Sequence, residues 1–425
     1  MIWLLFVSFF VFLSIGIPIG FVLILSTITY AFAIGEISWF LVPQRVIYGI
    51  NSFTLLCLPF FVLAGNIMNQ GGITQRLVRF AQAFIGHIRG GLALVDIMVC
   101  MMFGTISGSA VAGTAAVGSL LIPSMKEEGY DAPFTAGLTA VASTCCPVIP
   151  PSLAFVIYAS SAKVSVKDMF IAGIVPGIIM GALMMLVAFV YATKRNYPKQ
   201  PKASVKEKLE ATLSAIPCLG LPLVVIGGII LGWLTPTEAA AAAVLYSVLL
   251  SAFFYRSITW KGLWRSIVNS AIDSGSVMLI VGACYLFGWV ISNEQITTKL
   301  TEALVAMPYP LSIKLLFINF ALLIVGMFMD SAPAIMLIAP ILSPAMVSLG
   351  MDPIHVGMIV CINLTIGLST PPVGVCLYSA TNIARCNFGE TVKSAMPFVF
   401  AVLLALVLIT YIPFITNIPS LIMGI

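Results

Sequence analysis

The chain has 425 residues, of which 60% are hydrophobic and 8% are charged, and its formal net charge is +5. Soluble domains carry about 25% charged residues, so this composition excludes a water-soluble enzyme and gives no support to a nucleic-acid partner. The chain is therefore an all-helical, polytopic membrane protein that lies in the lipid bilayer. Its nine cysteines and two histidines lack ligand-like spacing, so neither a disulfide framework nor a transition-metal site is expected.

Apolar stretches of about 20 residues each predict full spanning helices along the chain. The first of them has no basic n-region and no small-residue cleavage motif, so we interpret it as a retained span and not as a signal peptide. The predicted spans are residues 2–33, 46–69, 131–161, 169–192, 213–234, 237–256, 266–292, 352–384 and 392–412.

Two further segments, 93–126 and 311–348, are too long for one span and carry a small or polar cluster near the middle. Such clusters predict re-entrant helical hairpins, because irregular backbone at membrane depth is tolerated only against protein or a wet cavity. A short amphipathic stretch precedes each hairpin, from Ile73 in the first half and over 296–306 in the second. We expect both stretches to be arm helices in the membrane interface, with a plain loop as the alternative.

A repeat of 221 residues relates the two halves of the chain without a gap. Prolines within apolar segments recur at this offset, which predicts helices that break at the same place in each half. In a membrane protein, this pattern is typical of a transporter whose binding site is formed by the breaks. The matched prolines are Pro123 and Pro344, Pro150 and Pro371, Pro151 and Pro372, and Pro176 and Pro397.

Basic residues predict the topology. The lysine-rich linker 194–210 is cytoplasmic by the positive-inside rule and separates a first repeat, 1–193, from a second repeat, 211–425. Counting spans from the linker places the first hairpin on the cytoplasmic side, the second on the periplasmic side, the N-terminus inside and the C-terminus outside. Five predicted spans lie between the hairpins, and an odd number inverts the second repeat.

The two proline-broken segments, 131–161 and 352–384, predict cation sites. Proline removes an N–H group and displaces the carbonyl four residues earlier, which frees the carbonyls of Cys146 and Gly367. Opposite them we expect the hairpin tips, so the available ligands are oxygen atoms, which suit Na⁺. The alternative is that the prolines merely kink packed helices.

Asp330 lies at the predicted tip of the second hairpin, where a carboxylate is costly unless it is paired or hydrated. It is expected to hold a cation or proton, to bind substrate, or to cap the following helix. Its counterpart in the first repeat is Ser109, which is followed by small residues at a helix start that favours an anion such as an organic carboxylate. Asp96 and Asp273 are expected to be interfacial or structurally paired.

Taken in order, several motifs resemble the large membrane subunit of the tripartite ATP-independent periplasmic (TRAP) transporters, over nearly the whole chain. They are Gly16-Ile17-Pro18-Ile19-Gly20, Pro59-Phe60-Phe61-Val62-Leu63-Ala64-Gly65, Gly104-Thr105-Ile106-Ser107-Gly108-Ser109, Pro147-Val148-Ile149-Pro150-Pro151-Ser152 and Thr370-Pro371-Pro372-Val373-Gly374.

The resemblance implies Na⁺-driven import of an organic acid across the bacterial inner membrane. The family's partners would be a periplasmic solute-binding protein and a small four-helix membrane subunit. It also implies an elevator mechanism, in which hairpins and broken helices move as one block against a scaffold. A sialic-acid-type sugar acid is expected slightly ahead of a C4-dicarboxylate.

By the same resemblance, at least two Na⁺ sites are expected, bound mostly through carbonyl groups, and a separate set of residues would contact substrate. A single-subunit Na⁺/anion symporter of related architecture is the alternative, and a membrane-embedded enzyme is disfavoured because the spans contain few acidic residues and histidines. The expected ligands are Ser107, Ser109, Cys146, Ile149 and Pro151 for the first ion, Gly326, Gly367, Thr370 and Val373 for the second, and Ser109, Asp330 and Ser152 for substrate.

Overall fold

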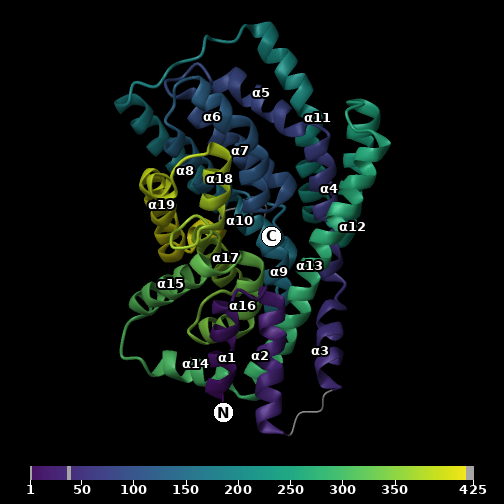
Figure 1. Cartoon of the computed structure of the whole chain (residues 1–425), viewed down its shortest axis with the longest axis vertical. Coiled ribbons are helices and arrows are strands. Elements are labelled where there is room, and N and C mark those ends of the chain that lie inside the picture. The colour runs from purple at the N-terminus through teal and green to yellow at the C-terminus, as the bar shows by residue number, and fades with distance from the viewer. Residues whose placement is uncertain (1, 36–39, 418–425) are drawn as a thin grey trace.

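The computed structural model describes residues 2–35 and 40–417, and over these ranges the chain is helical and has no strand (Figure 1). Seven of the described helices are long and apolar enough to cross a membrane, or eight if the bent pair α3–α4 is counted as one span. The all-helical membrane architecture predicted from composition is confirmed.

The first half of the chain forms ten α-helices and two short 3₁₀ turns in the described ranges. They are α1 (Ile2–Ser14), α2 (Ile19–Ile34), α3 (Leu41–Ile50), a turn at Thr54–Leu56, α4 (Cys57–Gln70), α5 (Ile73–Ile85), α6 (Gly91–Ser107), α7 (Ala110–Glu127), α8 (Ala132–Ala142), a turn at Ser143–Cys145, α9 (Leu153–Ala162) and α10 (Val166–Lys194).

The second half forms nine α-helices, one of which continues into a π-helical turn. They are α11 (Val205–Ile230), α12 (Pro236–Val248) with its π-helical end at Leu249–Phe254, α13 (Trp260–Asn293), α14 (Ile296–Ala306), α15 (Leu311–Phe328), α16 (Ser331–Ser348), α17 (Pro353–Gly367), α18 (Val375–Ala384) and α19 (Phe388–Tyr411).

The repeat is visible in the helix boundaries. The inner hairpin helices α7 and α16 each have 18 residues, and both of their ends differ by 221. A polar residue caps each of them, Ser109 on α7 and Asp330 on α16. Both broken helices carry a cis proline at the break, Pro150-Pro151 and Pro371-Pro372. The two re-entrant hairpins (α6–α7 and α15–α16) and the two broken helices (α8–α9 and α17–α18) are therefore confirmed.

The prediction of one span over residues 2–33 is wrong. α1 ends in a turn in which Gly16 has a φ of +86°, a conformation that favours glycine, and Pro18 then starts α2. α2 folds back and packs beside α1 (Figure 1). These two helices have 13 and 16 residues and are not among the helices long enough to count as spans, so the orientation of the N-terminus stays a prediction.

Two other boundaries differ from prediction. The segment predicted as a span over 46–69 is divided into α3 and α4, which meet at 66° around the turn at Thr54–Leu56. The predicted linker 194–210 ends early, because Ser204 and Glu207 form a capping box that starts α11 at Val205.

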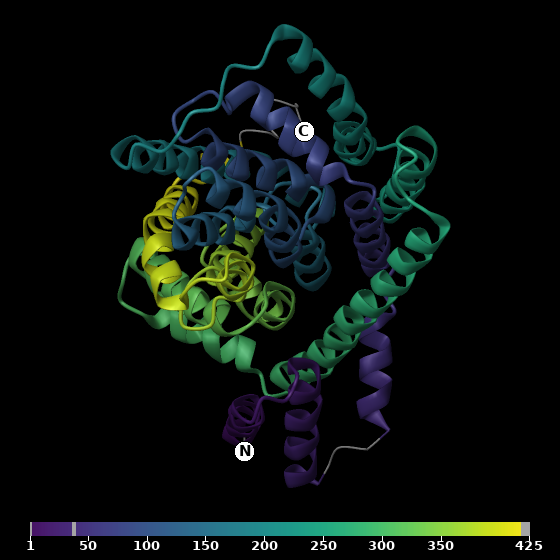
Figure 2. The same ribbon diagram turned by 45° about the horizontal axis from the view of Figure 1, so that its top comes forward.

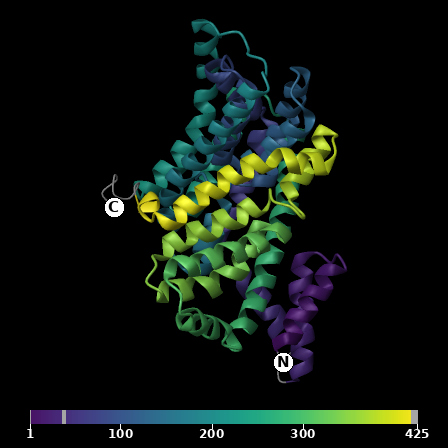
Figure 3. The same ribbon diagram turned by 90° about the vertical axis from the view of Figure 1, so that its left-hand side faces the viewer.

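The helices form two layers. The hairpins and broken helices of both repeats, together with α10 and α19, pack into one unit, which we call the core bundle (Figure 2). The helices α1–α4 and α11–α13 lie along its side as a frame, and the arm helices α5 and α14 connect the frame to the bundle at opposite ends (Figures 1 and 3). The predicted arm helices are thus confirmed as helices.

Within the core bundle, the two repeats interlock. The broken helices form its centre, and every residue of α17 from His355 to Gly367 is buried. The Tyr158 hydroxyl of α9 contacts the Ser343 hydroxyl of α16 at 3.1 Å and donates to the Pro353 carbonyl at 3.1 Å. Lys126 of α7 donates to the Ala384 carbonyl of α18 at 2.8 Å. Such contacts join segments that are far apart in sequence into one body.

Candidate functional site

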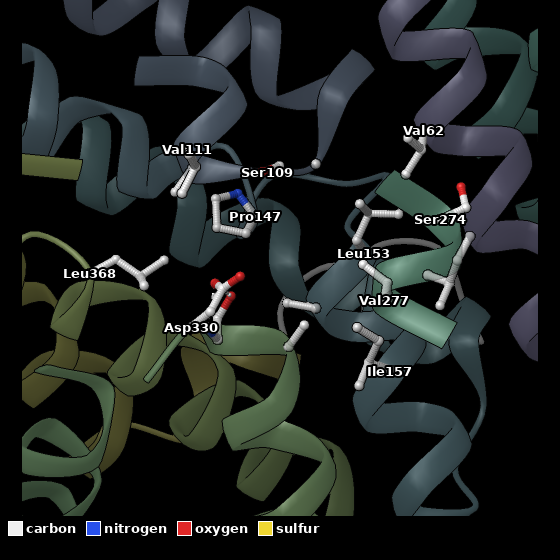
Figure 4. Close-up of a pocket in the computed structure, with 16 residues that line it drawn as sticks. Val62, Ser109, Val111, Pro147, Leu153, Ile157, Ser274, Val277, Asp330 and Leu368 are labelled. Atoms are coloured by element: carbon white, nitrogen blue, oxygen red, sulfur yellow. Dashed lines mark hydrogen bonds between the residues drawn. The ribbon is translucent and has the colours of Figure 1, made fainter. Parts of the chain in front are cut away.

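The two hairpin tips face a common cavity of about 100 Å³ between the core bundle and the frame (Figure 4). From the bundle, the cavity is lined by Gly108 and Ser109 of the first tip, by Asp330 of the second, and by Pro147 and Leu368 of the two breaks. Segments that are 221 residues apart in sequence thus meet at one place. Ligand sites usually measure about 300–1,000 Å³, so this cavity is smaller than a typical one.

The frame contributes the opposite wall of this cavity, and sequence reasoning missed it. Leu58 and Val62 of α4 and Ser274 and Val277 of α13 line this side (Figure 4). These residues belong to ordinary apolar helices and carry no motif. Only the packing of the frame against the bundle identifies them.

The first break is enclosed by the first hairpin. Gly104 of α6 lies so close to Cys146 that a Cβ atom there would be 2.6 Å from the Cys146 Cα. A Cβ atom on Gly108 at the tip would lie 3.2 Å from the Pro151 carbonyl oxygen. The backbone of the tip therefore reaches the backbone of the break directly. Within the described ranges, no hydrogen bond reaches the Cys146 carbonyl, as its predicted role requires.

The second break shows an even closer approach. Gly367 abuts Gly326 of α15, and a Cβ atom on Gly367 would lie 2.3 Å from the Gly326 carbonyl carbon. The Gly367 carbonyl is not free, however, because it accepts a hydrogen bond from the Thr370 amide at 3.0 Å. This corrects the expectation from the proline pattern. A carbonyl oxygen has two lone pairs, so one remains for a cation.

The two breaks also differ in exposure. Cys146 and Pro151 of the first break are buried, whereas the side chain of Val373 in the second break is 43% exposed. Ser107 is buried, and Ile149 and Thr370 are half-buried. The Thr370 hydroxyl donates to the Ile366 carbonyl at 2.9 Å. The structure thus gathers the residues assigned to each ion around the corresponding break and leaves the second break more open.

Asp330 caps the following helix, which is one of the roles that its sequence position left open, and it also lines the cavity. One carboxylate oxygen accepts a hydrogen bond from the Ser331 amide at 2.6 Å, so Asp330 is the N-cap of α16. The same side chain lines the cavity and is the sole carboxylate among its lining residues in the described chain. Ser109 faces the same space and caps α7 by accepting from the Ala112 amide at 3.4 Å (Figure 4).

Ser152 does not fit the role that was predicted for it. Its side chain is 1% exposed and does not line the cavity. The hydroxyl donates to the Pro147 carbonyl and accepts from the Phe155 amide, which makes Ser152 the N-cap of α9. The local geometry thus uses its hydrogen-bonding capacity to restart the broken helix, and we no longer assign it to substrate.

Asp96 contradicts the expectation that it is interfacial or paired. It lies on α6 inside the core bundle, is 0% exposed, and lies near the Thr139 hydroxyl of α8, but neither carboxylate oxygen meets the geometry of a hydrogen bond within the described chain. By contrast, Asp273 is exposed and accepts a hydrogen bond from Asn66 at 3.5 Å. A carboxylate buried without compensation destabilises a fold.

We therefore expect Asp96→Asn to raise the unfolding free energy by on the order of 1 kcal/mol, because a neutral amide of the same shape costs less to bury. Thermal unfolding of the purified protein in detergent measures the change. Asp273→Asn is the matched control and should leave the midpoint within about 1 °C. A lower midpoint for Asp96→Asn would show that the carboxylate is stabilising.

Comparison with known proteins assigns this chain to a family. Residues 6–415 match the family model described as "Tripartite ATP-independent periplasmic transporter, DctM component". The chain belongs to this family of TRAP transporter large subunits. The match covers the whole core bundle and nearly all of the frame, so both hairpins and both breaks lie within the family region, and the expected resemblance is confirmed.

Named relatives agree with this assignment. The chain is 39% identical to the C4-dicarboxylate TRAP transporter large permease protein DctM of Pseudomonas aeruginosa, over 85% of this chain and 84% of the relative. It is 38% identical to the 2,3-diketo-L-gulonate TRAP transporter large permease protein YiaN of Escherichia coli, over 94% of each. It is also 34% identical to the sialic acid TRAP transporter large permease protein SiaM of Vibrio cholerae, over 96% of each. These relatives are transporter permeases and not enzymes.

Two further comparisons concern a longer relative and a solved structure. The isethionate TRAP transporter permease protein DctMQ of Oleidesulfovibrio alaskensis is 37% identical, and the match covers 96% of this TRAP subunit but 65% of that protein. Among solved structures, the YdaH transporter of Alcanivorax borkumensis has a TM-score of 0.64 over 87% of each chain at 14% identity. That similarity concerns the fold alone.

Proposed function

We propose that this subunit imports an organic acid together with Na⁺ through the bacterial inner membrane, and that the core bundle moves as one block against the frame. The observation that carries the proposal is the convergence of both hairpin tips and both helix breaks on one cavity at the boundary between bundle and frame. In the described conformation, the cavity is smaller than a typical ligand site. Substrate binding therefore requires the tips or the bundle to move away from α4 and α13.

The oxygen atoms available around the two breaks support Na⁺ as the bound cation. The first site would use the unpaired Cys146 carbonyl with oxygens of Ser107, Ser109, Ile149 and Pro151 near the first tip. The second would use carbonyls of Gly326, Gly367 and Val373 and an oxygen of Thr370. Backbone contacts that leave no room for a Cβ atom at Gly104 and Gly367 hold each hairpin against its break. Bound Na⁺ would supply the positive charge that stabilises freed carbonyls and an anionic substrate.

The substrate class follows from the relatives and from the cavity. The relatives are named for C4-dicarboxylate, 2,3-diketo-L-gulonate and sialic acid, all of which carry a carboxylate. The start of α7 at Ser109 offers unpaired amides with small neighbours to such a group. Asp330 would accept hydrogen bonds from substrate hydroxyls on the opposite side. This arrangement favours a hydroxylated acid, of which a sialic-acid-type sugar acid is one.

The partners are a small four-helix membrane subunit and a periplasmic solute-binding protein. The match to DctMQ leaves about a third of that longer permease uncovered, a length available for a second membrane subunit. We infer that this chain works together with a small membrane subunit of that kind. A cytoplasmic linker supports a periplasmic C-terminus in this arrangement.

Uptake into proteoliposomes tests the proposal. The large subunit, a small subunit and a binding protein are reconstituted together, and radiolabelled acids are offered with an inward Na⁺ gradient or with choline in its place. We expect uptake to need the Na⁺ gradient, because the carbonyl-rich breaks are otherwise uncompensated. Equal uptake in choline would refute the Na⁺ sites. Full uptake without the other two proteins would favour a single-subunit symporter.

A further inference from the structure

A second cavity, of about 540 Å³, lies where three connections of the chain meet. They are the turn between α3 and α4, the turn between α9 and α10, and the turn between α11 and α12. Bundle and frame thus both contribute walls. We call this cavity the lysine cleft, after Lys163 and Lys167 in its bundle wall. Its volume lies within the range of about 300–1,000 Å³ that is usual for small-molecule sites.

The lysine cleft is next to the cavity at the hairpin tips, because two segments of the chain line both of them. In the frame, Leu58 lines the tip cavity and Thr54, four residues earlier, lines the cleft. In the bundle, Ile157 lines the tip cavity and Ser160, about one helical turn later, lines the cleft. With the linker cytoplasmic, as the positive-inside rule predicts, α10 leads back to an α9–α10 turn on the periplasmic side. The cleft is therefore the periplasmic continuation of the tip cavity.

The charge of the cleft is positive and uncompensated. Among its lining residues, Lys163 and Lys167 are charged and none is acidic. Within the described chain, the one recorded salt bridge joins Arg195 to Asp131, so neither lysine is in an ion pair. Of the nearby carboxylates, Asp168 lines a different cavity and Glu238 closes the capping box of α12.

Local helix chemistry does not by itself account for both lysines. Lys163 has a φ of +57° at the end of α9, where glycine is the less costly residue. Lys167 occupies the first turn of α10, where the helix dipole disfavours a cation and favours an anion. The ammonium group of Lys167 is thus placed against the dipole preference, whereas Lys163 lies at a helix C-terminus, where the dipole favours a cation.

Hydroxyl groups complete the cleft. The side chains of Ser52, Thr54 and Ser160 line it, and no hydrogen bond is recorded for their hydroxyls in the described ranges. They can donate to a carboxylate or accept from a substrate hydroxyl. Phe53 adds an exposed aromatic surface. Ammonium groups, free hydroxyls and one aromatic ring match a small hydroxylated carboxylic acid.

We propose that the lysine cleft is an entry site that binds the carboxylate of the incoming acid on the periplasmic side before the acid reaches the hairpin tips. This inference rests on the proposed function, because it assigns the first step of the same import. It adds a site separate from Ser109 and Asp330. Two lysines at the rim would also raise the local concentration of anions.

Thiol labelling tests the charge of the cleft without a known substrate. Ser160→Cys is purified in neutral detergent and treated with an anionic sulfonatoethyl or a cationic trimethylammonium-ethyl methanethiosulfonate. We expect the ratio of anionic to cationic labelling rates to be roughly fivefold higher at Ser160→Cys than at Ser292→Cys. Ser292 lies at the exposed end of α13. This preference should disappear when K163Q and K167Q are added. Eight of the native cysteines are buried, and the wild-type protein provides the labelling background.

The kinetics of uptake provide a second test of the lysine cleft. We expect K163Q/K167Q to raise the KM for the transported acid about tenfold and to leave the maximal rate within about twofold, because the charges act before the tips. K199Q/K202Q, in the exposed linker, is the matched control and should behave as wild type. Unchanged reagent preference and KM would overturn the inference while Na⁺-driven uptake by wild type still stood. Lower uptake with unchanged reagent preference would also overturn it and would assign the lysines to docking of the binding protein.

Discussion

Gly367→Ala is expected to reduce uptake by at least about tenfold. The new Cβ atom would lie 2.3 Å from the carbonyl carbon and 2.5 Å from the Cα of Gly326. Both neighbours are backbone atoms, so no side chain can rotate away, and α15 must shift from the second break. The hairpin tip that carries Asp330 follows directly on α15, so the cavity would be distorted. Initial rates of uptake in proteoliposomes measure the loss.

Gly288→Ala is the matched control, because nothing lies within 4 Å of a Cβ atom at that position in α13. Alanine in a helix interior is favoured over glycine by about 0.5–1 kcal/mol, so this variant should transport normally. Size-exclusion chromatography shows whether the Gly367→Ala variant is folded and so separates a local packing defect from global unfolding. If Gly367→Ala is unfolded, Gly326→Ala tests the same contact from the other side. Normal uptake by a folded Gly367→Ala variant would contradict the close contact.

Asp330→Asn is expected to lower the initial rate of uptake by at least about 100-fold with little change in thermal stability. Asparagine caps a helix about as well as aspartate, so the start of α16 should be kept. The substitution removes the sole carboxylate that lines the tip cavity in the described chain. If that charge binds a cation or substrate hydroxyls, its loss costs a charge-assisted hydrogen bond, which is about twice as strong as a neutral one.

Asp330→Ala separates the two roles of this residue. It removes both the charge and the cap, so it should lose transport and in addition about 1 kcal/mol of stability. Ser109→Ala removes the corresponding cap of α7 and leaves Asp330 in place, which provides a comparison at the other tip. Full activity of Asp330→Asn would show that Asp330 acts only as a helix cap.

Much of the architecture could be predicted from local sequence signals. Proline within an apolar stretch breaks a helix wherever it occurs, so the paired prolines located both breaks. A small or polar cluster midway along a long apolar segment located both hairpin tips, at Ser107–Ser109 and at Asp330. The constant offset of 221 identified the repeat, because a duplication preserves spacing even where side chains change.

Sequence by itself therefore determined the class of protein, the two hairpins, the two helix breaks and the residues nearest the breaks. The tertiary structure alone decided which of these residues are accessible. It buried Ser152 and placed Asp96 inside the core bundle without a hydrogen bond in the described chain. It also supplied the frame wall of the tip cavity and the lysine cleft. The physical reason is that helix breaks arise from neighbours along the chain, whereas burial, hydrogen-bond partners and cavities depend on contacts between segments that are far apart in sequence.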